Sequence, residues 1–341
     1  MTSNLESVLR DINKGAGDNV IGLGISQRSY DKVPFSSPRA NYMTYGGIPL
    51  YHITEFCGPE NSGKTTSAIN VIGNYQKRED AKTVVYIDVE HRFDPVWATK
   101  LGANVDDMVI YQPMGEPAET VLQNIRQLLM TNDVGFMVLD SIATLVPKAA
   151  DENDIEHKEM CGVSQIMTKF VNLIVPLLRK YQCTFIGINQ VRENLKSVYD
   201  PYVTPGGKAW KHQCILRIMF RKGKFIDKDG KELTMNPENP AGNIIQMVQL
   251  KNTCSRPDRH LSFYTINYTN GVRELEDTIE TAQQLDMITK RGAWYSLYDL
   301  ETGELLDVKL QGIDSVIKYM RDNPDYYHTF WEKVNEEICK E

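Results

Sequence analysis

The chain has 341 residues, of which 41% are hydrophobic and 24% are charged, and its formal net charge is −7. A chain of this length can bury a large core and predicts about two domains. The composition excludes disordered, collagen-like and fibrous proteins. The negative charge also excludes a histone-like protein that binds nucleic acid by bulk attraction, so any contact with DNA must be confined to a local basic groove.

The sequence shows no sign of a membrane or of an oxidising compartment. No apolar run approaches the ~20 residues of a membrane span, and residues 1–14 are charged throughout, unlike a signal peptide. The six cysteines stand singly, without the C-x-x-C pair of a zinc or redox site. We therefore expect a cytoplasmic protein with reduced thiols and no membrane partner.

The first residues of the chain predict a short amphipathic helix. Leu5, Val8, Leu9 and Ile12 recur at helical spacing, and glycines then interrupt the pattern. This pattern alone fits a helix that packs on the protein's own core about as well as one that packs elsewhere.

Apolar runs typical of strands recur from about residue 51. They cover residues 53–57, 83–88, 135–140, 183–189, 215–220, 244–250 and 261–268. Helical stretches at 64–76, 118–131 and 162–179 separate the first four runs. This alternation predicts a parallel sheet covered by helices, whereas the closer spacing of the last three runs predicts antiparallel or mixed pairing.

The composition of the sequence changes after residue 271. Charged helical stretches surround the aromatic segment 292–295, and a turn follows at 301–303. We expect a small C-terminal domain at residues 271–341.

The first expected strand leads into a segment that matches G-x-x-x-x-G-K-[ST] and precedes a helix, the context that a Walker A loop requires. The matching residues are Gly58, Pro59, Glu60, Asn61, Ser62, Gly63, Lys64 and Thr65, followed by Thr66. Backbone N–H groups of such a loop surround phosphate oxygens, Lys64 can reach the β- and γ-phosphates, and the Thr65 hydroxyl can ligate Mg²⁺. The segment predicts a site for ATP and Mg²⁺.

Two carboxylates follow apolar strands and should meet the phosphate loop at one edge of the sheet. Asp140 ends the strand 135–140 and is the second candidate Mg²⁺ ligand, and Ser141 beside it can help to hold the metal's water shell. Glu90 follows the strand 83–88, where a carboxylate can orient an attacking water. Taken alone, Glu90 fits a solvated residue after a strand better.

Four segments taken together resemble the bacterial RecA recombinase family. They are G-P-E-N-S-G-K-T-T at 58–66, D-V-E-H-R-F-D-P at 88–95, V-L-D-S at 138–141 and I-N-Q-V-R at 188–192. The resemblance extends to P-G-G-K-A-W-K at 205–211, L-K-N at 250–252 and G-A-W-Y at 292–295, and so covers nearly the whole chain. It implies an α/β fold with a RecA-type ATPase core at 31–270, a polymerisation helix and linker at 1–30, and a small α/β C-terminal domain.

The resemblance also implies roles for residues at the nucleotide. Glu90 is then the catalytic carboxylate that polarises water, and Gln190 senses the γ-phosphate and begins a DNA-binding loop. Lys251 reaches the γ-phosphate bound by the neighbouring subunit. Asp94 and Trp97 meet the adenine; the family usually has Tyr in place of Trp97, and an indole can stack on a purine equally well. A buried core position is the alternative for Trp97.

In this family two loops face the filament axis, and they correspond to residues 150–161 and 191–208. The first loop is acidic here, and Met160 is its expected contact with DNA. In the second, the expected contacts are Arg192, Lys196 and Lys208 with phosphates, Leu195 as a wedge between bases, and Gly206 and Gly207 for close backbone approach. Without the resemblance this segment fits an ordinary mobile loop.

Two positions depart from the family pattern. Gln165 replaces an arginine, which bears on DNA affinity, and Thr253 replaces the second lysine of K-N-K, which bears on the ATP contact between subunits. Arg256 is a candidate replacement because its fork suits phosphate. The divergent loops are compatible with a phage-encoded member, and the sequence leaves a bacterial or a phage origin open.

The function implied is that of a DNA-dependent ATPase that forms helical homo-oligomeric filaments on single-stranded DNA and exchanges strands with double-stranded DNA. A hexameric helicase of the same superfamily is one alternative, since it shares the P-loop and Gln190. A regulatory ATP-binding protein that assembles without exchanging strands is another. The N-terminal helix and the segment 292–295 favour the recombinase.

Overall fold

The computed structural model describes residues 3–16, 30–148, 162–193, 202–234 and 237–340. The chain divides into two compact units, Met1–Asp31 and Lys32–Glu341. In the first unit, α1 (Ser3–Ala16) is the amphipathic helix that the sequence predicts, and Leu5, Val8 and Ile12 lie exposed on it. None of the helices in the described ranges combines the length and apolar character that crossing a membrane requires.

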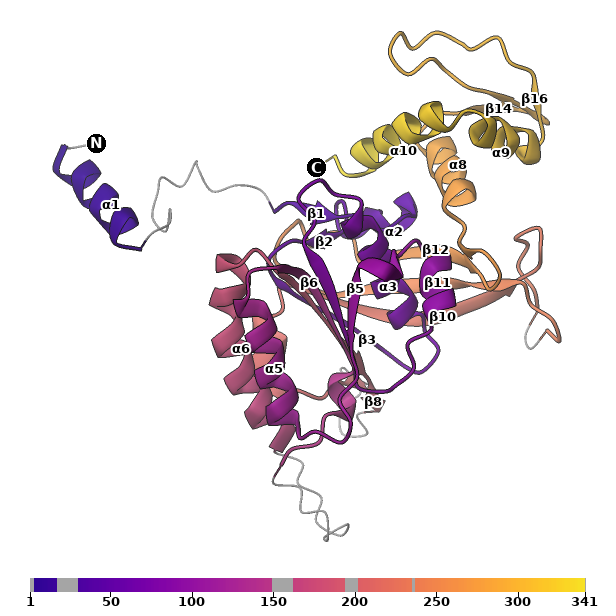
Figure 1. Ribbon diagram of the computed structural model, residues 1–341. Coiled ribbons are helices and arrows are strands. Elements are labelled where there is room, and N and C mark those ends of the chain that lie inside the picture. The colour runs from indigo at the N-terminus through magenta and orange to yellow at the C-terminus, as the bar shows by residue number, and fades with distance from the viewer. Residues whose placement is uncertain (1–2, 17–29, 149–161, 194–201, 235–236, 341) are drawn as a thin grey trace. The chain divides into compact units, whose positions relative to one another are not determined.

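A nine-stranded sheet forms the centre of the second unit (Figure 1). Its strands, in spatial order, are β13 (Gly271–Val272), β12 (Leu261–Asn267), β11 (Gly242–Asn252), β10 (Leu216–Ile226), β3 (Ile53–Gly58), β7 (Thr184–Gln190), β6 (Val134–Asp140), β4 (Thr83–Asp88) and β5 (Met108–Tyr111). Pairing is parallel from β10 to β5 and antiparallel from β10 to β13. The predicted fold class, with its mostly parallel central sheet, is confirmed.

Helices cover both faces of this sheet. They are α2 (Pro38–Tyr42), α3 (Lys64–Gln76), α4 (Pro95–Lys100), α5 (Ala118–Met130), α6 (Gly162–Lys180) and α7 (Gly207–Gln213). One core cluster packs α3 against the sheet, and a second cluster packs α5 and α6, which lie side by side in Figure 1, against the other face. Because both faces are covered, a strand such as β6 is buried along its whole length, which explains its continuous apolar sequence.

Shorter elements complete the unit: β1 (Lys32–Val33), β2 (Ile48–Pro49), β8 (Arg192–Glu193), β9 (Tyr202–Val203), and the 3₁₀ turns Val105–Asp107 and Ile142–Thr144. The expectation that residues 191–208 form one loop is wrong at its ends. Arg192–Glu193 pairs antiparallel with Tyr202–Val203, and α7 begins at Gly207. Gly206 adopts the left-handed backbone conformation before α7, with φ of 97°, which favours glycine.

The residues after β13 build a separate core. They form α8 (Glu274–Gln284), β14 (Thr289–Arg291), β15 (Trp294–Ser296), β16 (Leu310–Gln311), α9 (Ile313–Asp322) and α10 (Pro324–Ile338). The three strands make a small antiparallel sheet, and buried side chains such as Tyr295 and Phe330 pack between it and the helices. Helix α10 also bonds to the part of the chain that precedes β3, where Trp331 Nε1 donates to Ser36 O at 2.7 Å.

Candidate functional site

The predicted phosphate loop lies between β3 and α3, and its backbone requires glycine at two positions. Gly63 has φ of 94°, and a Cβ there would stand 2.4 Å from the Ile245 side chain; at Gly58 a Cβ would stand 2.3 Å from the Phe220 carbonyl oxygen. Side chains are therefore excluded at both positions. The loop borders a cavity of about 280 Å³, which we name the phosphate cavity.

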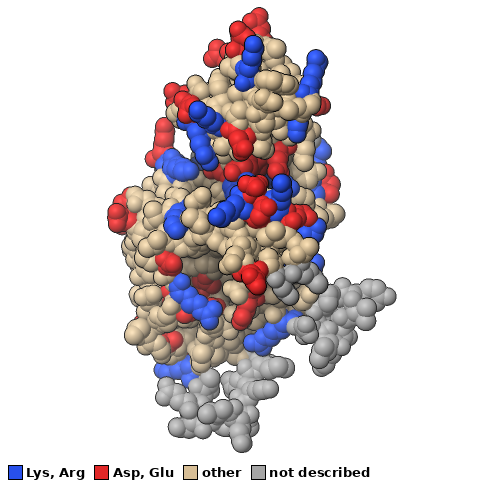
Figure 2. Space-filling model, turned by 90° about the vertical axis from the view of Figure 1, so that its right-hand side faces the viewer, with Lys and Arg blue, Asp and Glu red and all other residues tan. Residues whose placement is uncertain are grey.

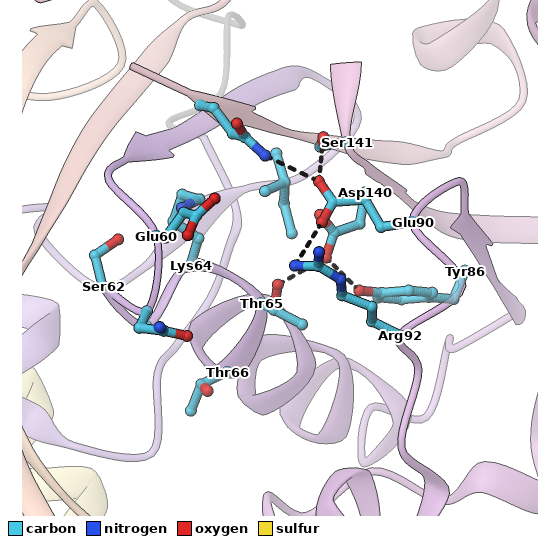
Figure 3. Close-up of a pocket in the computed structure, with 14 residues that line it drawn as sticks. Glu60, Ser62, Lys64, Thr65, Thr66, Tyr86, Glu90, Arg92, Asp140 and Ser141 are labelled. Atoms are coloured by element: carbon cyan, nitrogen blue, oxygen red, sulfur yellow. Dashed lines mark hydrogen bonds and ion pairs between the residues drawn. The ribbon is translucent and has the colours of Figure 1, made fainter. Parts of the chain in front are cut away.

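The phosphate cavity collects residues from four segments that are distant in sequence (Figure 3). Its lining comprises Glu60, Asn61, Ser62, Gly63, Lys64, Thr65, Thr66, Tyr86, Glu90, Arg92, Asp140, Ser141, Ile188 and Gln190. Most of the predicted nucleotide-site residues are thus brought together, while Gly58 and Pro59 contribute backbone carbonyls behind the loop. The Lys64 amine donates to both carbonyl oxygens, at 3.0 and 2.6 Å, and burial lowers its pKa.

Asp140 lies deep in this cavity and accepts two hydrogen bonds on Oδ2. The Thr65 hydroxyl and the Tyr86 hydroxyl each donate to it at 2.7 Å. Burial raises the pKa of the Asp140 carboxyl, against the effect of these two hydrogen bonds. The sequence analysis missed Tyr86; the signal for it is a tyrosine hydroxyl two residues before Asp88 in an otherwise apolar run.

Thr65 and Asp140 fit a Mg²⁺ ion. A hydroxyl and a carboxylate oxygen 2.7 Å apart are the hard oxygen donors that this ion prefers. Among the described residues no group of three or more His, Cys, Asp or Glu could hold a metal. A Mg²⁺ ion that uses one or two protein ligands would complete its shell with phosphate oxygens and water.

Glu90 is placed beside Asp140 because β4 and β6 are neighbours, with Asp88 opposite Asp140. Its Oε1 accepts hydrogen bonds from Ser141 Oγ at 2.6 Å and from Gln190 Nε2 at 3.2 Å. Its Oε2 lies 3.3 Å from Arg92 Nη1. The Ser141 hydroxyl, expected near the metal's water shell, thus bonds to Glu90, and the Gln190 amide bonds to the same carboxylate oxygen.

A second cavity of about 310 Å³ adjoins the phosphate loop, and we name it the base cavity. It is lined by Asn61, Gly63, Thr66, Trp97, Lys222, Asn243, Ile245, Ile266 and Tyr268. Trp97 is partly buried: it packs against the core cluster that contains Ile245 and Ile266, as the alternative interpretation expects, and it also lines this cavity. Asp94 does not line this cavity; its Oδ1 accepts from the backbone N–H groups of Val96 and Trp97, and so caps the helix that carries Trp97.

The structure gathers the described part of the expected DNA-binding residues around a third cavity, of about 750 Å³. We name it the DNA cavity after those expected contacts; it is lined by Ala143, Val163, Ser164, Arg192, Val203, Thr204, Pro205, Gly206, Gly207, Lys208 and Lys211. Among these described residues three are cationic and none is acidic. Lys211 was not predicted, although it ends the quoted segment 205–211. Met160, Leu195 and Lys196, and the loop 150–161, lie outside the described residues.

Lys251 does not reach the phosphate cavity of its own chain. Its amine donates to the backbone carbonyls of Lys211 at 3.2 Å and His212 at 2.7 Å, near the end of α7. The Thr253 hydroxyl donates to Ile215 O at 3.0 Å, which leaves that side chain engaged within its own subunit.

A buried polar network joins the DNA cavity to the strand that leads into the phosphate loop, since Asn189 Nδ2 donates to the cavity residue Pro205 at its carbonyl oxygen, at 2.9 Å. Glu55 on β3 is fully buried and pairs with Arg217 on β10, with Nε and Oε2 2.5 Å apart. Its Oε1 accepts from Trp210 Nε1 at 2.8 Å and from Asn189 Nδ2 at 2.9 Å. The sequence analysis missed this network, and its only local signal is an acidic residue within an apolar strand.

A glycine-shaped phosphate loop between strand and helix, a carboxylate at the end of β6 and a glutamate after β4 together define a P-loop ATPase.

The comparisons with known proteins narrow this class. The RecA N-terminal domain family matches residues 3–273 and the RecA C-terminal domain family matches residues 276–339. Protein RecA of Leptospira biflexa is 34% identical over 281 residues, which cover 82% of this chain and 67% of that protein. Protein RecA of Fusobacterium nucleatum is 32% identical over 340 residues, 98% of this chain and 85% of that protein. The chain belongs to the RecA family and is a RecA-type recombinase with DNA-dependent ATPase activity.

Proposed function

We propose that this chain binds ATP and Mg²⁺ in the phosphate cavity and couples hydrolysis to the exchange of homologous strands between single- and double-stranded DNA. The observation that carries the coupling is the contact between Gln190 and Glu90. Gln190 ends β7, and Arg192 two residues later lines the DNA cavity. One short segment therefore runs from the phosphate cavity to the DNA cavity. These roles place the protein in the cytoplasm, where ATP and DNA are both present.

The phosphate loop and its neighbours bind the triphosphate. Backbone N–H groups of the loop and the Lys64 amine face its phosphate oxygens, for which Lys64 exchanges its two carbonyl partners. Thr65 and Asp140 would hold the metal, which supplies positive charge to the β- and γ-phosphate oxygens. In the base cavity, Trp97 offers a flat face to the adenine, and Asp94 fixes the helix that presents it.

Glu90 acts as the carboxylate that polarises the attacking water. Ser141 holds its Oε1 and thereby orients the carboxylate toward the cavity. Gln190 exchanges its Glu90 contact for the terminal phosphate, and because it is continuous with the segment that carries Arg192, this exchange links nucleotide binding to DNA binding.

We assign the remaining DNA contacts to Arg192, Lys208 and the backbone at Gly206 and Gly207, with Lys211 added. Figure 2 shows acidic and basic side chains interspersed over one face of the molecule.

Assembly into a helical filament rests on two features. Helix α1 leaves 47% of Leu5 and Val8 and 43% of Ile12 exposed, an apolar face that a neighbouring subunit can cover. Lys251 is held away from its own phosphate cavity, which suits a contact with the nucleotide of the next subunit. We accordingly propose residues 1–30 as polymerisation segment, 31–270 as ATPase core and 271–341 as C-terminal domain.

Imaging and strand exchange together test this function. With ATP and single-stranded DNA we expect open helical filaments, and with a homologous duplex we expect exchanged strands; closed rings without exchange would instead support a helicase. Lys251→Ala should spare ATP binding but abolish DNA-stimulated hydrolysis, whereas Thr253→Lys should be tolerated. Full DNA-stimulated activity in Lys251→Ala would contradict the proposed contact between subunits.

A further inference from the structure

Arg92 is a cation of the phosphate cavity to which neither the sequence patterns nor the family resemblance assigns a role. Among the described residues that line this cavity, Lys64 and Arg92 are positive, against the carboxylates of Glu60, Glu90 and Asp140. The protein groups alone therefore leave the cavity short of positive charge for a triphosphate. Each cation that can reach a phosphate oxygen matters for binding there.

The backbone that carries Arg92 is firmly held. His91 adopts the left-handed conformation, with φ of 53°, and turns the chain after β4. The N–H groups of Arg92 and Phe93 then donate to the buried Asp88 carboxylate, at 3.1 and 2.9 Å. Gln112 Nε2 donates to the same carboxylate at 2.9 Å, which fixes the acceptor from a second segment. The Cα of Arg92 is thus fixed in place.

The guanidinium at the other end of the side chain is loosely held. The Arg92 side chain is 77% exposed, and its Nη1 lies 3.3 Å from Glu90 Oε2 (Figure 3). A guanidinium has five N–H donors, and this ion pair uses one of its nitrogens. An exposed ion pair with a single contact contributes little free energy, so a stronger acceptor can displace it.

The partner of Arg92 is the proposed catalytic carboxylate. Glu90 Oε1 accepts from Ser141 and Gln190, and Arg92 faces Oε2, so both oxygens are engaged. A carboxylate needs an oxygen available to a water molecule in order to polarise it. Whatever draws Arg92 away from Glu90 therefore removes a positive charge from Oε2 and makes that oxygen a stronger acceptor for the water.

We propose that Arg92 is a phosphate-binding residue that exchanges Glu90 for the terminal phosphate of the nucleotide held by its own subunit. A phosphate takes the planar guanidinium through two parallel hydrogen bonds and carries more charge than a carboxylate. The same movement provides positive charge at the terminal phosphate and leaves Glu90 Oε2 to the water. This second consequence rests on the proposed function of Glu90, whereas phosphate binding by Arg92 does not.

Nucleotide affinities test the proposal directly. The dissociation constants of ADP and of the non-hydrolysable triphosphate AMP-PNP are measured with Mg²⁺ on the full-length protein without DNA. Arg92→Ala should weaken AMP-PNP binding about tenfold, the size of one charged hydrogen bond, and leave ADP binding unchanged. Arg92→Lys, which keeps the charge without the fork, should lie between. Arg78→Ala, which removes an arginine–carboxylate pair with Asp80 outside the cavity, is the control and should change neither.

Unchanged AMP-PNP affinity in Arg92→Ala would overturn the proposal, and so would an equal loss for both nucleotides, because the guanidinium would then not select the terminal phosphate.

Mixed assemblies decide whether Arg92 serves its own subunit. Each Lys64→Ala subunit keeps Arg92 but lacks the phosphate-facing amine. If Arg92 serves only its own subunit, no subunit of a mixture with Arg92→Ala subunits has both groups at one nucleotide, and DNA-stimulated hydrolysis should not be restored. Recovery would place Arg92 at a neighbour's nucleotide and overturn the assignment. Glu90→Gln, measured in parallel, tests the proposed function separately through turnover.

Discussion

Glu55 and Arg217 form an ion pair inside the core, whereas Glu90 and Arg92 form one at the phosphate cavity. The two pairs differ in burial and in the distance between nitrogen and oxygen, which is 2.5 Å in the first and 3.3 Å in the second. The side chain of Glu55 is fully buried and that of Arg217 is 13% exposed; for Glu90 and Arg92 the exposed fractions are 15% and 77%. Burial acts to lower the pKa of Arg217, but the charge and hydrogen bond of Glu55 raise it overall.

The difference between the two pairs separates a fixed part of the site from an exchangeable part. Both Glu55 oxygens are bonded within the core, to Arg217, Trp210 and Asn189, so the network holds α7 and β7 against the strand that enters the phosphate loop. The Glu90 oxygens are bonded to side chains that can find better partners on a phosphate. The buried network thus fixes the position of the DNA cavity relative to the phosphate loop. The weak contacts that Gln190 and Arg92 make with Glu90 can change when the nucleotide binds.

The largest effect is expected from Glu90→Gln. The amide keeps the shape of the side chain but cannot polarise water, so turnover should fall by about 10²- to 10⁴-fold while nucleotide binding persists. Steady-state ATPase assays with DNA and equilibrium binding of AMP-PNP measure the two quantities. Turnover near that of the wild type would remove Glu90 from catalysis.

A loss of about 3–5 kcal/mol in the free energy of unfolding is expected for Arg217→Met, because the substitution leaves the buried Glu55 charge without its partner. Denaturant unfolding measures this loss. The double variant Glu55→Gln with Arg217→Met should recover part of the stability, since it removes the stranded charge while an amide oxygen still accepts from Trp210. If the single variant is as stable as the wild type, the pair does not fix the core as described.

Asp277 extends the comparison to a buried carboxylate with a poor partner. Arg39 Nη1 lies 3.8 Å away and is closer to Glu280, at 2.6 Å, and burial raises the pKa of Asp277 to about 7. The folded state therefore binds a proton that the unfolded state releases between about pH 4 and 7, so stability falls as pH rises through this window.

Asp277→Asn should remove this pH dependence, because an amide does not titrate. The free energy of unfolding of the variant, relative to the wild type, should increase from pH 5 to pH 8.5 by at least about 1.4 kcal/mol, the equivalent of one pKa unit. Parallel denaturant unfolding at the two pH values measures the difference. The same relative stability at both values would show that Asp277 keeps an ordinary pKa.

The smallest effect on stability is expected at the exposed pair. Arg92→Ala should change the free energy of unfolding by no more than about 1 kcal/mol, as for other exposed ion pairs. Thermal unfolding of Arg92→Ala beside Arg217→Met measures this contrast. A large loss in Arg92→Ala would mean that Arg92 supports the fold rather than the nucleotide.

The sequence predicted what is contiguous along the chain. The glycines and Lys64 of the phosphate loop, and the apolar strand that ends at Asp140, each form a local pattern with one structural meaning. Short elements without such a pattern, such as β5 and α4, were missed, and the first two residues of the helix that begins at Gly207 were placed in the loop 191–208.

The sequence predicted that Asp140 and Glu90 meet the phosphate loop, but not most of the individual side-chain contacts between distant segments. Glu55 meets Arg217 across 162 positions, and Asp140 meets Tyr86 across 54, through strand neighbours that only the folded sheet defines. The family resemblance named Glu90 and Gln190 but not Arg92, whose meaning depends on a turn held by Asp88.

The central claim is that Gln190 links the phosphate cavity to the DNA cavity, and the affinity for single-stranded DNA with and without AMP-PNP tests it most directly. In the wild type we expect the nucleotide to tighten DNA binding by about 5- to 150-fold, the usual range of coupling between two sites. Gln190→Ala should bind DNA with the same affinity in both conditions, because the side chain that exchanges Glu90 for the phosphate is gone. Undiminished tightening in Gln190→Ala would contradict the account.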